Sequence, residues 1–210
     1  MGALYDHESI IVFFIFIMDI STDVIKELRD RTSVSIMQCK KALEEAGGDI
    51  AQAEVILRKR SAGAAEKKAD RELAAGAIGT YVHENTIGAM VLLSSETDFV
   101  SQNPEFIALA RDIAMHVAAS NPKYITTEAI PADALEAART VFVKEVEGKP
   151  AEMQEKILEG KMSSYFSTDV LVEQVYIKDE SKKIRDLLNE ASQKFGERIE
   201  VSQFSRFSAR

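Results

Sequence analysis

The spacing of the apolar residues changes near residue 73, and this change constrains the fold more than any other feature of the chain. Before it, apolar residues recur every three or four positions, so that Val24, Ile25 and Leu28 would share one face of a helix. After it, the runs GAIGTYV and IGAMVLL, separated by HENT, have the pattern of a β-hairpin. Helices followed by strands predict an α+β protein with a helical N-terminal domain and a later sheet.

Residues 18–58 predict a small domain of three helices. The GGD sequence supplies a glycine stop for the second helix and an Asp cap for a third, which would run from Ile50 to about Lys59. The predicted caps of the three helices are Ser21 or Thr22, Ser33 or Ser35, and Asp49.

One face of the second helix is predicted to be buried, because its apolar residues fall within a narrow arc at 100° per residue. Met37 lies off this stripe, so we expect it to be exposed. A lone surface residue is the favoured interpretation, and contact of its flexible thioether with a partner is the alternative. The single cysteine is interpreted as a core thiol, and its isolation favours a cytoplasmic protein without disulfides. The predicted stripe consists of Ile36, Cys39, Leu43 and Ala46.

Residues 59–72 mix basic and acidic side chains with little apolar pattern, and we interpret them as a basic helical linker. A solvated spacer is favoured there over a nucleic-acid contact. The whole chain has a net charge of −8, from 26 basic and 34 acidic residues. Because phosphate binding rests on a basic surface, no direct nucleic-acid partner is expected.

Residues 1–17 form an apolar extension of a different character. The run IIVFFIFIM is about half as long as a membrane-spanning helix requires. No Lys or Arg precedes it, as a secretory signal would need. We therefore expect translation to start at Met18, with a peripheral anchor as the alternative. No later stretch is suited to cross a membrane.

Residues 73–210 predict an α+β core in which helices cover a small antiparallel sheet. A helix over about 104–119 follows the hairpin, with Phe106 on its apolar face. The later predicted elements are helices near 131–147 and 150–166, a strand over 170–177, a helix from a Ser181 cap to Phe195 that Gly196 ends, and a last strand with Ile199, Val201 and Gln203 facing inward.

The sequence offers no recognisable site for metal, phosphate or covalent chemistry. It lacks a GxxxxGK[ST] loop, and His7, His83 and His116 are scattered without further metal ligands at a defined spacing. Carboxylates are plentiful but lie on predicted helix surfaces, without an apolar pocket that would raise a pKa. We expect no metal, no cofactor and no enzymatic activity.

The stretch SSETDFVSQNPEF places an aromatic ring in a polar loop, and two interpretations remain open. Thr97 or Asp98 can form a turn while Phe99 folds back into the core. Alternatively, Asp98 and Phe99 are exposed, and the ring enters a groove of a partner. In the next helix, His116 lies near the edge of the apolar arc, where a half-buried, locally hydrogen-bonded histidine is favoured.

Several stretches, in the same order, resemble bacterial elongation factor Ts, the guanine-nucleotide exchange factor of elongation factor Tu. VIKELRDRTSVSIMQCKKALEEAGGDIAQAEVILRK resembles the opening three-helix domain of that family. ETDFV is similar to its signature loop, and DIAMHVAASNPKYI to its second signature. EGKM and VSQFSRF fit later segments, so that the resemblance runs from Asp19 to about Arg206.

The resemblance implies that the three-helix domain, residues 18–58, is of the UBA-like kind and docks on the GTPase domain of elongation factor Tu. It further implies that a loop near the magnesium and nucleotide site of that partner promotes release of GDP. The family often has Met at position 36, where this chain has Ile. The implied loop residues are Thr97, Asp98, Phe99 and Val100, with Asp98 and Phe99 as the active pair, and the other implied contacts are Arg29, Ile36, Met37 and His116.

Longer family members carry the sheet-and-helix unit twice, whereas this chain has it once. The short members are expected to act as dimers, so a homodimer is an open expectation. Two rival functions remain: an adaptor whose three-helix domain captures a partner helix, and a weak RNA binder that uses the linker. An adaptor needs no exposed Asp–Phe pair, and the acidity of the chain disfavours RNA.

Overall fold

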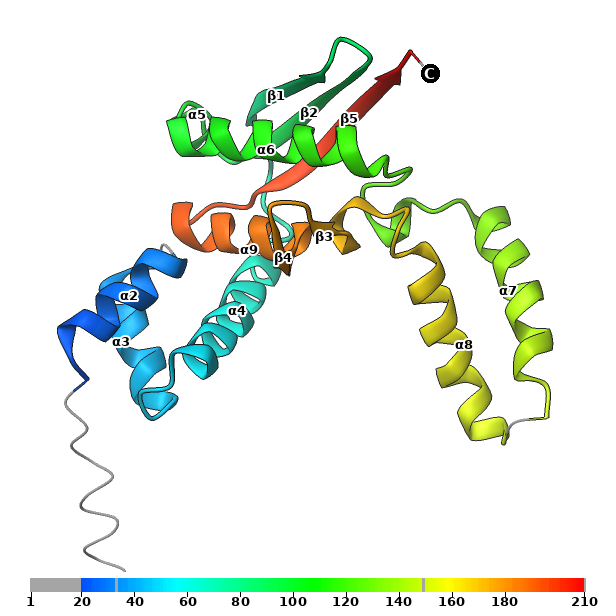
Figure 1. Cartoon of the computed structure of the whole chain (residues 1–210), viewed down its shortest axis with the longest axis horizontal. Coiled ribbons are helices and arrows are strands. Elements are labelled where there is room, and N and C mark those ends of the chain that lie inside the picture. The colour runs from blue at the N-terminus through cyan, green and yellow to red at the C-terminus, as the bar shows by residue number, and fades with distance from the viewer. Residues whose placement is uncertain (1–19, 33, 149, 210) are drawn as a thin grey trace, which may run out of the picture.

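The computed structural model of the protein describes residues 20–32, 34–148 and 150–209 and has the predicted α+β fold (Figure 1). Three helices lie at one end of the long axis, a sheet with its helices in the middle, and a helical hairpin at the other end. The predictions for residues 1–17 and for a start at Met18 lie outside the described residues. Within the described residues, every helix is too short or too polar to span a bilayer.

The N-terminal end contains the three predicted helices, and local capping explains where each begins. The Ser21 hydroxyl accepts a hydrogen bond from the Val24 N–H (3.3 Å), and the Ser35 hydroxyl accepts one from the Gln38 N–H (3.4 Å). The Asp49 carboxylate caps the third helix in the same way, and Gly47 and Gly48 have the positive φ that ends the second. The helices are α2 (Thr22–Thr32), α3 (Ile36–Glu45) and α4 (Ile50–Glu66).

The three helices enclose their own apolar cluster, which includes Leu28, Leu43 and the predicted core thiol Cys39, all fully buried. Ile36 is 53% exposed, so its predicted place in the stripe is wrong. A helical side chain lies over the turn that precedes it, and α3 begins at Ile36, so this side chain has no such turn. Val34 is buried in the cluster instead.

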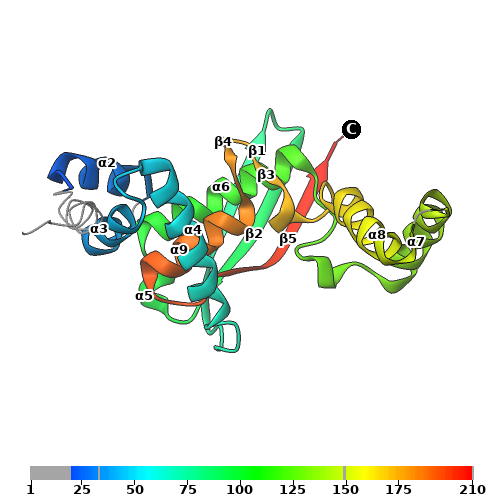
Figure 2. The same ribbon diagram turned by 90° about the horizontal axis from the view of Figure 1, so that it is seen from below.

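Helix α4 continues past the predicted end near Lys59 and takes up about half of the predicted linker. Its C-terminal half packs beside α9 (Ile184–Phe195), as Figures 1 and 2 both show. Ser61 is buried in this contact, so the expectation of a solvated spacer is wrong for this part of the linker. The charged residues Lys59, Arg60 and Glu66 of this stretch are exposed, which is why their pattern concealed the docking.

The sheet is antiparallel with the strand order β1-β2-β5, and α6 (Pro104–Ser120) covers one of its faces. The predicted hairpin forms β1 (Ala75–His83) and β2 (Ile87–Ser95), and β5 (Glu200–Ser208) pairs with β2. Gly79 permits the closest approach, since a Cβ there would overlap the backbone of Ala110 in α6. The predicted apolar face of α6 is buried on this sheet.

The region between residues 170 and 183 differs from its prediction. The expected strand over 170–177 is a 3-10 helix, η2 (Leu171–Glu173), followed by the two-residue strand β3 (Val175–Tyr176). The short strand β4 (Asp179–Lys183) pairs with β3, so α9 begins after it and Ser181 does not cap that helix. Leu171 and Val172 are buried as their apolar character requires, but in a 3-10 helix and not in a strand.

The last strand faces the core with Val201, as predicted, but Gln203 is exposed. A register shift on β2 between Leu92 and Leu93 inserts one extra residue into β5, which reverses the alternation beyond it. Gly196 ends α9 with a φ of 77°, as predicted.

The far end of the molecule is a hairpin of α7 (Ala132–Val146) and α8 (Ala151–Phe166), close to the predicted bounds. It projects away from the sheet in both views (Figures 1 and 2). Ion pairs between Lys161 and Glu145 (2.6 Å) and between Arg139 and Glu155 (3.8 Å) join its two helices.

Replacing Gly79 with Ala should destabilise the fold by about 1–3 kcal/mol, because the added methyl group must push α6 away from β1. Gly88→Ala is the matched control on the neighbouring strand, since its Cβ would lie 3.8 Å from the nearest atom, on Val82. Urea unfolding followed by circular dichroism measures both free energies. Equal stability of the two variants would contradict this packing.

Candidate functional site

The TDFV stretch forms a single helical turn, α5 (Asp98–Ser101), between β2 and α6. Successive residues of a helical turn point about 100° apart, and here they separate into an inner and an outer set. Val100 and Ser101 are buried, whereas Asp98 is exposed and the Phe99 side chain is 88% exposed. Of the two interpretations of this loop, the core ring is wrong for Phe99, and Val100 takes that place.

The carboxylate of Glu197 holds the chain just before this turn. It accepts hydrogen bonds from the Glu96 N–H (3.1 Å), the Thr97 N–H (3.0 Å) and the Thr97 hydroxyl (2.5 Å). In addition, the Ser95 hydroxyl donates to the Thr97 carbonyl (3.0 Å). Thr97 is therefore fixed by its side chain and by both of its backbone groups, so the turn that carries Phe99 starts from a defined position.

Glu96 in turn binds the segment that contains Glu197. Its carboxylate accepts from the Arg198 N–H (2.6 Å) and from the Arg71 guanidinium (3.1 Å). We call these reciprocal contacts of Glu96 and Thr97 with Glu197 and Arg198 the glutamate clamp. The Arg198 N–H is the main reason that the pKa of Glu96 lies below its ordinary value. This stabilisation is present above the ordinary carboxyl pKa and is lost as the pH falls through the lower folded-state value.

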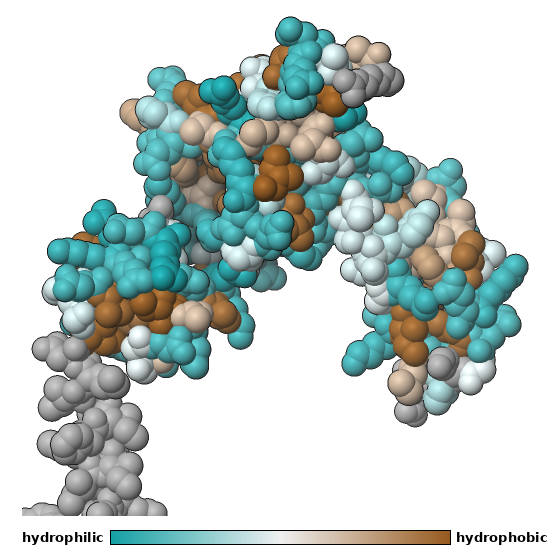
Figure 3. Space-filling model, viewed as in Figure 1, coloured by the Kyte–Doolittle hydropathy of each residue, from teal (hydrophilic) through white to brown (hydrophobic). Residues whose placement is uncertain are grey.

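Helices α2 and α3, which carry the residues predicted to contact a partner, lie at the same end of the molecule as α5 (Figures 1 and 2). Met37 is 69% exposed, as predicted, and Ile36 and Arg29 are also exposed. Figure 3 shows apolar side chains gathered on one side of this domain. Arg29, Ile36 and Met37 stay candidates for a docking surface that is separate from the Phe99 turn.

His116 is not part of that surface. Its side chain is fully buried, so the half-buried position read from the helical period is wrong, because η2, β3 and the residues after α8 cover this part of α6. Its Nε2 lies 2.8 Å from the Gln174 amide oxygen, and its ring lies 6.2 Å from the Tyr176 ring. Burial lowers the pKa of His116. A role of His116 in partner contact stays a prediction, and it would have to act through these neighbours.

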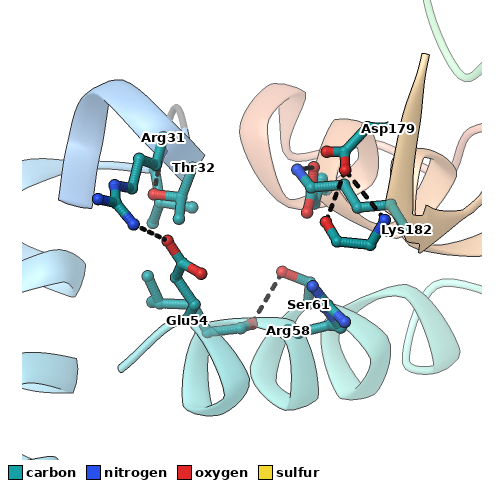
Figure 4. Close-up of a pocket in the computed structure, with 11 residues that line it drawn as sticks. Arg31, Thr32, Glu54, Arg58, Ser61, Asp179 and Lys182 are labelled. Carbon is teal, nitrogen blue, oxygen red and sulfur yellow. Dashed lines mark hydrogen bonds and ion pairs between the residues drawn. The ribbon is translucent and has the colours of Figure 1, made fainter. Parts of the chain in front are cut away.

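A polar groove separates the three-helix domain from the core beside α4 and α9 (Figure 4). Arg31 and Glu54 line it on one side, and Asp179 and Lys182 on the other. Among the described residues, no group of three or more His, Cys, Asp or Glu side chains is placed to hold a metal ion.

Comparison with known proteins bears on what this arrangement is for. A family described as "Elongation factor TS" matches residues 26–210 of the chain. The chain belongs to the elongation factor Ts family. Elongation factor Ts of Thermodesulfovibrio yellowstonii is 47% identical over 191 residues, which cover 90% of this chain and 96% of that relative. The relatives of the same name from Thermotoga maritima and Myxococcus xanthus are 46% and 43% identical over the same share of this chain, and 96% and 88% of their own lengths are covered.

The match to the elongation factor Ts family includes every residue singled out above, from Arg29 to His116. Sequence reasoning missed Glu197 and Arg198, although they position the turn. Glu197 follows the glycine that ends α9 and looks like an ordinary loop residue. Its contact with Glu96 spans 101 residues, and no local pattern signals such a pair.

Replacing Glu197 with Ala should accelerate hydrogen exchange of the Glu96 and Thr97 amides by about tenfold or more, because both lose an ionised acceptor. Exchange at Leu43 in the three-helix core should stay unchanged. Glu190→Ala is the control, since Glu190 lies on α9 but pairs with Lys182. Unchanged protection at Glu96 and Thr97 would show that the clamp does not hold the turn.

Proposed function

We propose that the protein is a guanine-nucleotide exchange factor for elongation factor Tu and promotes release of GDP. Membership of the elongation factor Ts family supports this role. The observation that carries it is Phe99, whose ring is 88% exposed on a turn fixed by the glutamate clamp. A large apolar ring held outward in this way is suited to enter a groove of a partner.

Exchange follows from linked binding equilibria. A factor that binds nucleotide-free elongation factor Tu more tightly than the GDP complex must weaken GDP binding by the same ratio. The factor makes and breaks no covalent bond in this scheme, so we propose a binding protein and not an enzyme. No nucleic acid or membrane takes part, and the place of action would be the cytoplasm.

The ring of Phe99 can supply part of the required free energy. Full burial of a Phe side chain is worth about 1.5–3 kcal/mol, or about one to two orders of magnitude in an equilibrium constant. The clamp adds to this, because a turn that is already ordered loses little conformational entropy on binding. A binding free energy of this size is significant, but the other contacts with the partner must add to it.

We further propose that the turn disturbs the Mg²⁺ and phosphate site of the partner. Mg²⁺ bridges phosphate oxygens to protein ligands and neutralises their charge, so displacing its ligands removes much of the affinity for GDP. Asp98 and Phe99 would be the active pair within Thr97–Val100. The exposed carboxylate of Asp98 makes no hydrogen bond or ion pair within the described part of the chain and is free to meet a partner.

In this proposal the chain divides by role into residues 18–58 for docking, 59–72 as a linker and 73–210 as the core. Arg29, Ile36 and Met37 would contact the partner from the first part. The rival adaptor would use only that docking surface. It leaves the exposed Phe99 without a purpose, which is why exchange is favoured.

Stopped-flow release of a fluorescent GDP from elongation factor Tu tests the proposed function with protein beginning at Met18. Wild type should accelerate release catalytically, whereas Phe99→Ala and Asp98→Ala should each lose about tenfold or more of that acceleration. Tyr165→Ala is the control, because Tyr165 is an exposed ring on α8, a different element from the turn that carries Phe99. Binding of wild type without faster release would identify an adaptor instead.

We also propose a homodimer through the face of the sheet that α6 does not cover. The strand register places Ile78, Val82, Met90 and Phe207 together on this face, and they are 47–71% exposed. Contiguous exposed apolar side chains of this kind favour a protein interface.

Replacing Met90 with Asp should convert the dimer to a monomer, because a carboxylate would be buried without a partner. Sedimentation velocity at micromolar concentration measures the mass. Val143→Asp is the control on the helical hairpin. A wild type that sediments as a monomer would exclude this dimer.

A further inference from the structure

The three-helix domain and the α+β core have separate apolar interiors. The two buried clusters share no residue among those described, although α4 runs from one domain to the other. On one side of the joint the polar groove separates the domains (Figure 4). The orientation of the three-helix domain is therefore set by the packing of α4 beside α9 and by the polar contacts within it.

Gln193, near the end of α9, makes the central contacts of this joint. Its amide nitrogen donates to the side-chain oxygen of Gln38 on α3 (2.8 Å), and its amide oxygen accepts from the Ser61 hydroxyl on α4. Ser61 is buried, and its hydroxyl oxygen also lies 3.0 Å from the Leu57 carbonyl oxygen. One side chain of the core thus binds two helices of the other domain.

Residues next to Gln193 in α9 also contact the chain just beyond α4 and the start of α6. The Lys68 ammonium, just beyond α4, donates to the Ser192 carbonyl (2.7 Å) at the end of α9. On the opposite side, Lys194 pairs with Glu105 in the first turn of α6. Glu197, four residues after Gln193, holds the turn of Phe99 through the glutamate clamp. The end of α9 and the residues just after it therefore contact the elements that carry both candidate docking surfaces.

We propose that the end of α9 is a common anchor that sets the position of the Phe99 turn relative to the three-helix domain, with Gln193 as its positioning residue. Gln193 touches neither the turn nor the exposed residues Ile36 and Met37, and it acts through Gln38 and Ser61. Two surfaces held in one orientation bind a partner as a single site. Loosely joined surfaces bind it more weakly, because their relative motion must be restricted on binding.

The functional part of this inference rests on the proposed exchange activity, but the positioning itself is measurable without any partner. Spin labels on Lys40→Cys and Gln102→Cys report the distance between the two parts of the full chain, since both positions are exposed. The native Cys39 is fully buried, so we expect the labelling reagent not to reach it in the folded protein. Electron–electron double resonance then gives the distance distribution.

Gln193→Leu should broaden this distribution, because leucine keeps the bulk and loses both hydrogen bonds. Gln52→Leu is the matched control, since it makes the same change on the exposed side of α4. In the GDP-release assay, Gln193→Leu should raise the half-saturating concentration of the factor about tenfold and leave the maximal rate within about twofold. Circular dichroism confirms that each variant is folded.

An unchanged distribution in Gln193→Leu overturns the positioning role. A broader distribution with an unchanged half-saturating concentration overturns its importance for exchange. If the distribution broadens but wild type does not accelerate GDP release, the anchor stands and the proposed function fails. The combination of a broader distribution, weaker binding and a preserved maximal rate supports both.

Discussion

The reciprocal hydrogen bonds between Glu96 and the Glu197–Arg198 segment are the constraint on which the site depends. They join the point where β2 leaves the sheet to the point where the chain enters β5, so they fix one end of the sheet as well as the turn. Each carboxylate accepts a hydrogen bond from a backbone N–H of the other segment. A hydrogen bond to an ionised acceptor is stronger than one between neutral groups. The outward direction of Phe99 follows from this arrangement and from the burial of Val100 beside it.

Local signals in the sequence were sufficient for much of the fold. Ser35 and Asp49 cap helices, Gly196 ends one, and the hairpin follows from its two apolar runs. These features depend on a few neighbouring residues, so a single sequence contains their causes. Ile36 was misplaced because a regular helical wheel ignores where the helix begins.

Other features that the sequence did not reveal depend on distant segments. His116 is buried because residues near 170–176 cover α6, and Ser61 is buried because α9 lies against α4. The orientation of Phe99 belongs to the same class, since a one-turn helix is too short for its period to be recognised. Its two interpretations could be separated only by the partners of Thr97 and Val100.

The exposed ring of Phe99 has a consequence for how the chain can evolve. An apolar side chain left in water contributes almost nothing to folding, so this position forgoes stabilisation that a buried ring would give. A variant that folded the ring inward would gain stability and lose its outward surface. Selection for thermal stability alone would therefore act against this residue, and its retention would mark selection for contact with another molecule.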